Sequence, residues 1–338
     1  MEMISSRERL IKTFEFNNPD KLAVYYHPSP AGLYVHGQKL LDLFNEYPPD
    51  NHIVFDEIPK PTADAFDGDG RYHEFKTDQW QVKWEYRIFG IAGHPCGFPL
   101  KDFSSLDNYK FPALPEIDKD QIAKLKKDYM VWAPTWISIF EILHSLRPFE
   151  AVLMEIYTKD KNIIKLIEKI AEWNRKLVKK SLEADCDIFS FGDDWATQNS
   201  LFFSPEIFRE LFKGIIADLI KPIKDAGKKV LYHCCGAAEP LFDDFIDLGI
   251  DCYWHQMGLY NDKAFAKRAA DAGVVLYLHL DRQNLIPKGN PAEIEQAVKK
   301  YADIHKKLGG GAIFYVEIEN DAPFENVEAL IKSIDRYR

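Results

Sequence analysis

The sequence predicts an α/β fold, a (β/α)8 TIM barrel with an N-terminal extension and an insertion rich in aromatic residues, glycine and proline. Short β-branched or aromatic runs alternate with long amphipathic patterns along most of the 338 residues. Eight such runs occur, as this barrel requires. No glycine-rich dinucleotide fingerprint follows the first run, which disfavours a doubly wound sheet. That open sheet stays an alternative, because a sequence does not show closure.

The predicted strands, in chain order, cover residues 22–26, 52–55, 130–133, 187–191, 230–233, 251–254, 274–280 and 312–316. Helical periodicity is clear between them, for example over residues 163–178. Ser204 and Asn290 each precede a proline, a pattern that starts helices. Glycines 227, 249 and 273 each stand just before a predicted strand, where they are typical of helix ends.

Residues 57–115 differ from the rest of the chain. They are rich in glycine, proline and aromatic residues, and the alternation over residues 79–88 indicates a hairpin or two strands. We therefore expect a single barrel domain over residues 1–338, with an insertion of about residues 57–115 covering one face.

Composition excludes several classes of protein. Hydrophobic residues make up 46% and charged residues 28%, which is typical of a globular chain and not of a disordered one. The net charge of −10, without a local basic patch, argues against a nucleic-acid partner. Apolar runs are shorter than the ~20 residues of a membrane helix, and charges interrupt residues 1–10 where a secretory signal would stand. We expect a cytoplasmic protein without a membrane partner.

The five cysteines are an odd number in a long chain, which favours reduced thiols over a disulfide framework. A functional cysteine here is therefore expected to be a metal ligand or a nucleophile.

Polar residues follow the predicted strands. They are His27, Asp56, Thr135, Asp193, Asp194, His233, Cys235, His255, Gln256, Asp281, Glu317 and Glu319. In a barrel the carboxyl ends of the strands form one rim, where active sites lie. We expect His27, His255, Gln256 and Asp281 to line a substrate pocket there, with Trp195 in its wall.

His233 and Cys235 are the strongest local indication of chemistry. Residues two apart on an extended strand share a face, so an imidazole nitrogen and a thiolate can bind one ion, and both are zinc ligands. A third ligand must come from another strand end, and Glu317 and Glu319 are the candidates. Cys252, His255 and His279 are further candidates. The alternative is that the cysteines are small buried residues and His233 is a hydrogen-bonded core histidine.

Two adjacent acids, Asp193 and Asp194, follow an apolar strand. They project in different directions, so one can enter a cavity as an acid or base while the other caps the next turn. Glu141, in the otherwise apolar run 137–143, is a weaker catalytic candidate of the same kind.

The sequence resembles the uroporphyrinogen decarboxylase superfamily, and within it the corrinoid-linked methyltransferase branch. The matching stretches are 77–80, 99–102, 191–195, 204–206, 233–236, 285–287, 309–311 and 323–327. Their order and spacing imply the (β/α)8 barrel. In the methyltransferase branch a His-x-Cys pair and a later cysteine bind zinc, and His233 and Cys235 match that pair.

Two departures from the family matter. Decarboxylases carry arginines in an N-terminal loop that grips substrate carboxylates, but residues 25–32 contain none, which disfavours porphyrinogen decarboxylation. No cysteine follows Cys252, so the third zinc ligand of the methyltransferases is missing. Two possibilities stay open: a zinc site of histidine, cysteine and glutamate, or no zinc site.

The resemblance implies methyl transfer between a small methylated donor, such as a methoxy compound, or a thiol, and a corrinoid carried by a separate protein. Zinc would act as a Lewis acid, and an acid such as Asp194 would assist the leaving oxygen. Two alternatives stay open. One is decarboxylation of a tetrapyrrole or smaller carboxylic acid, with Asp193 or Asp194 acting without metal in the case of a small acid; the other is a non-catalytic binding protein.

Overall fold

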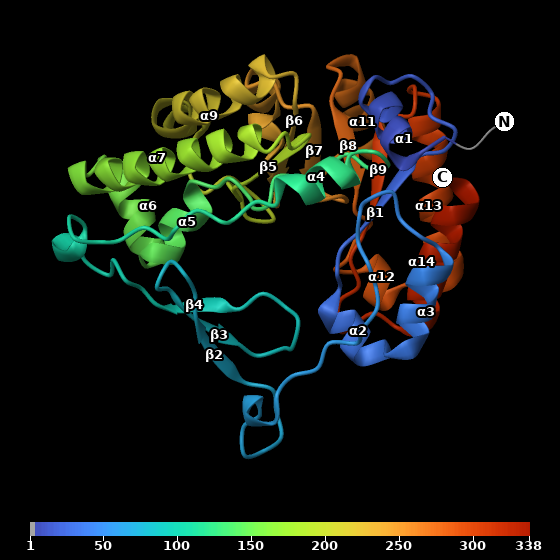
Figure 1. Cartoon of the computed structure of the whole chain (residues 1–338), viewed down its shortest axis with the longest axis horizontal. Coiled ribbons are helices and arrows are strands. Elements are labelled where there is room, and N and C mark those ends of the chain that lie inside the picture. Colours follow the sequence, from blue (N-terminus) through green and yellow to red (C-terminus); the bar gives the residue numbers. More distant parts are fainter. Residues whose placement is uncertain (1–3) are drawn as a thin grey trace.

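Six parallel strands form a curled sheet with helices on its outer side (Figure 1). The computed structural model describes residues 4–338. The strand order is β1-β9-β8-β7-β6-β5. The strands are β1 (Ala23–Tyr26), β5 (Ile188–Gly192), β6 (Lys229–Cys234), β7 (Cys252–His255), β8 (Val275–Leu278) and β9 (Ala312–Val316). The predicted α/β alternation is therefore confirmed over this part of the chain.

The helices mostly follow the strands that they connect. They are α1 (Ser6–Phe14), α2 (Pro30–His36), α3 (Gln38–Glu46), α4 (Lys119–Leu125), α5 (Phe140–Leu146), α6 (Phe149–Thr158), α7 (Lys161–Glu183), α8 (Pro205–Phe208), α9 (Gly214–Asp225), α10 (Phe242–Asp247), α11 (Asp262–Asp271), α12 (Leu285–Lys288), α13 (Pro291–Lys306) and α14 (Phe324–Tyr337). Asn290 caps α13 in a capping box with Glu293, as predicted, whereas the Ser204 side chain makes no cap hydrogen bond to α8. No helix within residues 4–338 has the length and apolar character needed to cross a membrane.

Apolar side chains fill both sides of the sheet. On the inner side Tyr25, Ile188 and Leu231 pack with Leu10 and Phe14 of α1, which covers the amino-terminal end of the curl. A larger cluster lies between the outer side of the sheet and the surrounding helices. The sheet is thus anchored on both faces, and its carboxyl ends are left for the site.

The sheet does not close into the predicted barrel. Residues 52–55 were expected to be a strand but form none, and Val54 is 67% exposed. Only the two residues before them pair with β1, through the backbone of Asp50 and the side chains of Asp50 and Asn51. Residues 48 and 49 are both proline, which lack the N–H groups of a strand ladder.

The predicted strand 130–133 is also not continuous. Its chain runs parallel to β5 and makes isolated bridges, Trp132 to Ile188 and Ile137 to Phe191. Pro134 interrupts the ladder between these two bridges, because it has no donor to give. The gap in the curl therefore lies between β1 and this segment.

An antiparallel sheet lies within the predicted insertion. It consists of β2 (Glu74–Thr77), β3 (Lys83–Tyr86) and β4 (His94–Gly97), in that order. Only β3 falls inside the run 79–88 that predicted a hairpin. In Figure 1 this sheet lies between α5 and α2, on the side of the molecule to which the carboxyl ends of the parallel strands point.

Candidate metal site

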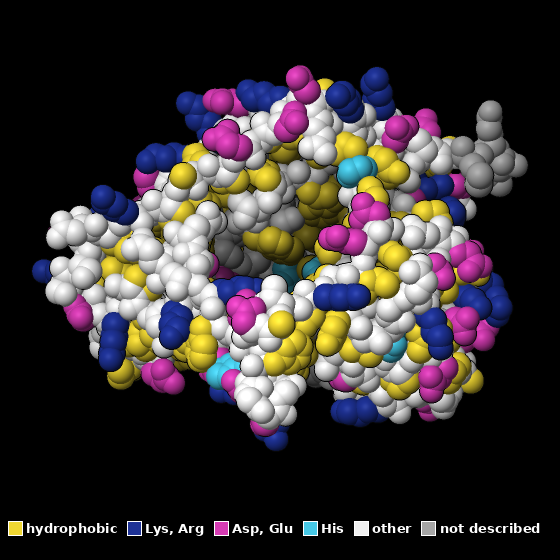
Figure 2. Space-filling view, turned by 60° about the horizontal axis from the view of Figure 1, so that its bottom comes forward, with side chains coloured by type: hydrophobic (Ala, Val, Ile, Leu, Met, Phe, Trp, Pro, Cys, Tyr) yellow, Lys and Arg dark blue, Asp and Glu magenta, His cyan; other side chains and the backbone are white. Residues whose placement is uncertain are grey.

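The carboxyl ends of β6, β7, β8 and β9 surround a cavity of about 220 Å³. Residues that line it include His233, Cys235, Trp254, His255, Gln256, His279, Asp281, Arg282 and Glu317. Figure 2 shows the corresponding hollow in this face, with histidine side chains in its depth. Four of the strand ends that were predicted to carry polar residues therefore meet around one space.

Asp194, His233 and Cys235 converge at one side of this cavity. One ligand atom from each lies within 4.8 Å of the other two. His233 Nε2 is 3.4 Å from Cys235 Sγ and 3.6 Å from the nearer Asp194 carboxylate oxygen. The parallel register pairs Gly192 of β5 with His233 of β6, so Asp194 comes beside Cys235. The Cys235 N–H donates to Asp194 Oδ1 at 2.7 Å, which holds the carboxylate in place.

The His233 ring is oriented by β7. Its Nδ1 lies 3.0 Å from the Trp254 carbonyl oxygen, which can only accept, so Nδ1 carries the proton. Nε2 therefore presents a lone pair to Cys235 and Asp194. A backbone carbonyl in this position is the usual partner of a metal-binding histidine.

The donor set fits a tetrahedral zinc ion. Ligand bonds of roughly 2.0 Å to nitrogen and 2.3 Å to sulfur place those two atoms about 3.5 Å apart at a tetrahedral angle. The 3.4 Å between His233 Nε2 and Cys235 Sγ agrees with that spacing. One oxygen, one nitrogen and one sulfur donor leave a fourth position for a substrate, as catalytic zinc sites do.

Burial also shapes the charge of this site. Burial lowers the pKa of His233, so its imidazole is neutral at pH 7 and available as a ligand. Burial, with the Asp194 carboxylate, raises the pKa of the Cys235 thiol to about 12. The thiolate is therefore favoured only when a cation lies beside it.

The predicted third ligands lie apart from this trio: Glu317 lines the cavity, and Glu319 is not among its lining residues. Glu317 is 3.5 Å from His27 Nδ1 and 4.0 Å from His279 Nε2, and Glu319 is 3.3 Å from Arg282. The carboxylate that joins the His-x-Cys pair is that of Asp194. The role of either glutamate as a ligand stays a prediction.

Asp193 has a different environment from Asp194. It is 3% exposed, and its carboxylate accepts the N–H groups of Ile139, Phe140 and Glu141 at the start of α5. Burial raises its pKa to about 8, although these N–H groups oppose the shift. Asp193 thus anchors the start of α5, an earlier element and not the next turn as expected, whereas the Asp194 carboxylate lies beside His233.

Glu141 supports the site from behind. Its Oε1 accepts the Asp194 N–H at 3.2 Å, and its Oε2 lies 3.2 Å from His144. Burial opposes ionisation, but the hydrogen bond and charge of His144, together with the Asp194 N–H, outweigh it and lower the pKa of Glu141. Glu141 therefore contacts the backbone that carries Asp194.

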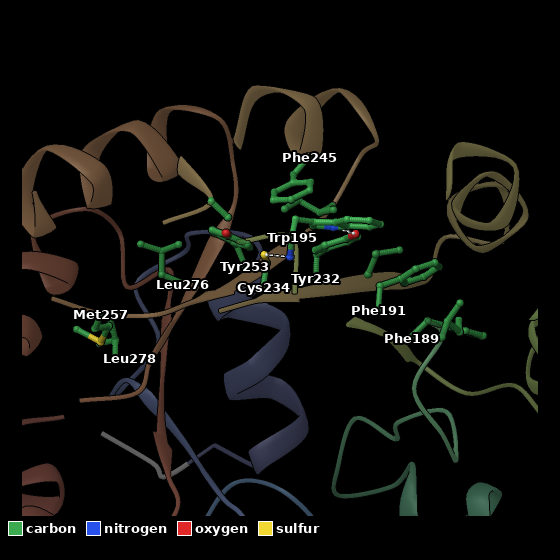
Figure 3. Packing of buried hydrophobic residues seen from close by; sticks show 14 of the residues in the cluster. Phe189, Phe191, Trp195, Tyr232, Cys234, Phe245, Tyr253, Met257, Leu276 and Leu278 are labelled. Atoms are coloured by element: carbon green, nitrogen blue, oxygen red, sulfur yellow. Dashed lines mark hydrogen bonds between the residues drawn. The ribbon is translucent and has the colours of Figure 1, made fainter. Parts of the chain in front are cut away.

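The residues that were predicted to line the substrate pocket lie in different environments. Gln256 accepts the Gly236 N–H at 3.0 Å, and Asp281 accepts N–H groups of the turn that follows β8. His255 is 3% exposed, and His27 lines a neighbouring cavity. Trp195 is fully buried: it packs in the core with Tyr232 (Figure 3). Burial of a large apolar ring explains why Trp195 does not form a pocket wall.

Arg282 is a site residue that the sequence analysis missed. Its Nη2 lies 3.8 Å from Cys235 Sγ and its Nη1 lies 3.3 Å from Glu319. It directly follows Asp281 at the end of β8, so its position beside a predicted site residue was the available indication.

A family model matches the chain, and one solved structure has a similar fold over its whole length. A family model described as uroporphyrinogen decarboxylase (URO-D) matches residues 135–337, more than half of the chain. A solved "methyltransferase from Methanosarcina mazei" is similar at a TM-score of 0.62 and 16% identity, covering 99% of this chain and 99% of that one. A B12-independent methionine synthase from Shewanella sp. W3-18-1 follows at a TM-score of 0.39 and 9% identity, covering 78% of this chain and 72% of that one. None of the curated proteins compared with the sequence matches it.

Proposed function

Because the chain belongs to the uroporphyrinogen decarboxylase family, we propose that it is a methyltransferase that moves a methyl group between a small methylated compound, or a thiol, and a corrinoid carried by a separate protein. The convergence of Asp194, His233 and Cys235 at the strand ends carries this proposal. Similarity to the architecture of the Methanosarcina methyltransferase, over nearly the full length of both chains, supports it.

Asp194, His233 and Cys235 would hold zinc. Zinc bound there supplies a Lewis acid that draws electron density from the heteroatom of the methyl donor. The Trp254 carbonyl fixes the tautomer of His233, and the Cys235 N–H fixes Asp194. The protein thereby presents three oriented ligand atoms toward the cavity.

In the demethylation direction the bond between the methyl carbon and the heteroatom breaks, and its electron pair stays on the heteroatom. The reduced corrinoid of the partner supplies the electron pair of the new cobalt–carbon bond. The leaving heteroatom then takes up a proton. Glu317 lines the same cavity, and burial raises the pKa of its carboxyl group, so it is suited to supply that proton.

The charge of the site argues against porphyrinogen decarboxylation. Among the described residues that line this cavity and its two neighbours at the strand ends, Arg282 is the single lysine or arginine. It already lies between Glu319 and Cys235. A substrate with several carboxylates would lack the cationic partners that it requires.

Zinc content tests the metal site. Protein purified without chelators under zinc-replete conditions should contain about one zinc ion per chain. His233→Ala, Cys235→Ala and Asp194→Ala should each lose it, whereas Cys96→Ala, which removes an exposed thiol, should keep it. Wild-type protein without zinc under these conditions would reject the site.

Methyl transfer is tested by the spectral change of an added reduced corrinoid protein, with candidate methyl donors supplied one at a time. The zinc-free variants should lose at least a hundredfold in rate, since a removed ligand abolishes the electrophilic centre. Turnover of uroporphyrinogen instead would establish the decarboxylase.

A further inference from the structure

A second cavity adjoins the metal-binding residues. Its volume is about 290 Å³, and it lies inside the curl between β1 and the irregular segment beside β5. Trp254 lines both this cavity, which we term the aromatic chamber, and the cavity that contains His233. The chamber and the cavity at the candidate metal site therefore share Trp254 in their walls.

Tyrosine and tryptophan residues are prominent in the chamber lining. They are Tyr25, Tyr26, Trp132, Trp136, Trp254, Tyr277 and Tyr315, of which Tyr26 turns its ring away, against Phe44 and Phe55 of the outer cluster. The Trp254 ring centroid is 4.4 Å from that of Tyr315 and 4.2 Å from that of His233, and the Trp136 centroid is 6.1 Å from His233. Trp254 of β7 and Trp136 of the irregular segment beside β5 thus flank the imidazole of His233.

Trp136 is seated on a glycine. A Cβ atom at Gly192, the last residue of β5, would lie 2.7 Å from Cε3 of the Trp136 ring. Trp136 is nevertheless 42% exposed, so its ring covers the backbone of β5 and also faces open space. This exposed indole is available to a ligand without disturbing the core.

The chamber carries no full charge. None of its described lining residues is lysine, arginine, aspartate or glutamate. Its histidine, His27, is half-buried and accepts the Ser29 N–H at Nδ1; burial lowers its pKa, so it is neutral at pH 7. An anionic ligand would lose its hydration here without gaining a cationic partner, whereas a neutral one would not.

The size of the chamber selects the kind of neutral ligand. An apolar cavity of about 150 Å³ is large enough to hold benzene. A cavity of about 290 Å³ holds a substituted benzene ring, while methanol would leave most of it empty. Aromatic rings also gain about 0.5–1.5 kcal/mol per pair from offset or edge-to-face contacts with such walls.

We propose that the aromatic chamber binds the ring of a neutral aryl methyl ether and that Trp136 and Trp254 place its methoxy group beside His233. This inference rests on the proposed function, for which it names the class of methyl donor. The aryl-oxygen–methyl bond breaks, its electron pair stays on the oxygen, and protonation gives a phenol. The methyl carbon would form a new bond to the cobalt of the partner's reduced corrinoid, and the corrinoid would supply the electron pair of that bond.

Binding of the product tests the proposal without any corrinoid. Calorimetric titration of the zinc-loaded protein should show phenol binding about tenfold more tightly than cyclohexanol, which has nearly the same size and no aromatic ring. Trp136→Ala should weaken phenol binding about tenfold, and Trp136→Phe should restore most of it. Tyr157→Ala removes an aromatic side chain that is 78% exposed on α6 and should change nothing.

Equal binding of phenol and cyclohexanol would overturn the proposal, as would phenol binding that Trp136→Ala leaves unchanged while its circular dichroism matches that of the wild type. A donor panel gives a second test: methoxybenzene should outcompete methanol and methoxycyclohexane as methyl donor. If the wild type binds phenol as described but transfers no methyl group, the proposed function fails and the aromatic site stands. If methyl transfer occurs but methanol is the preferred donor, the proposed function stands and the aromatic site fails.

Discussion

The two halves of the curled sheet are built by different means. From β5 to β9 the strands pair through continuous parallel backbone ladders, and the candidate metal ligands stand at the ends of β5 and β6. Between β1 and β5 the ladder is interrupted, and side chains take over much of the pairing. Asp50 and Asn51 reach the backbone of β1 with their side chains, and Pro134 breaks the pairing along β5.

This difference separates two tasks. A backbone ladder fixes strand ends to within fractions of an ångström, which metal ligands require. An interrupted ladder leaves space, and here that space is the aromatic chamber between β1 and the segment beside β5. The gap that prevents closure of the sheet thus provides room for the proposed substrate.

The irregular half of the sheet, between β1 and β5, should be destabilised most by removal of Asp50. Its carboxylate is 3% exposed, binds Arg9 and Arg338, and accepts the Val24 N–H at 2.9 Å. Asp50→Ala leaves two buried guanidinium groups without this partner, which should cost about 3–5 kcal/mol of the free energy of unfolding. Urea unfolding measures the loss.

A matched control is Asp225→Ala, which removes one exposed ion pair with Lys221 within α9 and should cost about 0.5 kcal/mol or less. Equal losses for the two variants would contradict the view that Asp50 holds the irregular half.

The sequence predicted the regular half of the sheet, but it did not predict where the pairing in the irregular half is interrupted. Strands of the regular half, β5 to β9, follow from apolar runs; glycines such as Gly227 and Gly273, whose positive φ angles end the preceding helices, stand just before two of them. The run 52–55 has the same apolar character as those strands, but its pairing with β1 ends at Asp50 and Asn51 and does not continue along the run. Pairing is a long-range property, so local pattern alone could not reveal the gap.

The site shows the same limit. Spacing within one strand was enough to predict His233 and Cys235 as partners, and both lie in the cluster. The companion from another strand depends on how two strand ends are staggered. The register between β5 and β6 brings Asp194 rather than a glutamate of the last strand to this pair, and no local pattern encodes that register.

Low pH should lower the free energy of unfolding through His305 of α13, the helix that connects β8 and β9 in the regular half of the sheet. This residue is 3% exposed, and burial lowers its pKa to about 4. The unfolded chain binds the proton first, near pH 6.5, so stability is complete above that pH and falls as the pH drops toward 4. The loss over this window should be about 3 kcal/mol.

His305→Leu should remove that part of the acid sensitivity, measured as the free energy of unfolding at several pH values between 7 and 4. His94→Leu, at an exposed position on β4, is the control and should keep the wild-type slope. Parallel pH profiles for wild type and His305→Leu would contradict the assignment.

Asn51→Ala has the smallest expected effect on stability. It tests the difference between the two halves of the sheet most directly, because the Asn51 side chain takes the place of a backbone ladder. Asn51 Oδ1 accepts the Tyr26 N–H at 2.9 Å, and its Nδ2 donates to the Tyr26 carbonyl at 3.0 Å. Asn51→Ala leaves both groups of this buried strand residue without that partner, at a cost of about 2 kcal/mol. Asn108→Ala, at an exposed position, should cost less than about 0.5 kcal/mol.

Asn51 also lines the aromatic chamber, so the two properties should change together. If side-chain pairing shapes the chamber, Asn51→Ala will weaken phenol binding while the zinc content, set by the regular half, stays at the wild-type level. Loss of zinc together with phenol binding would show that the two halves depend on each other, since a disturbance at β1 would then have reached the ends of β5 and β6.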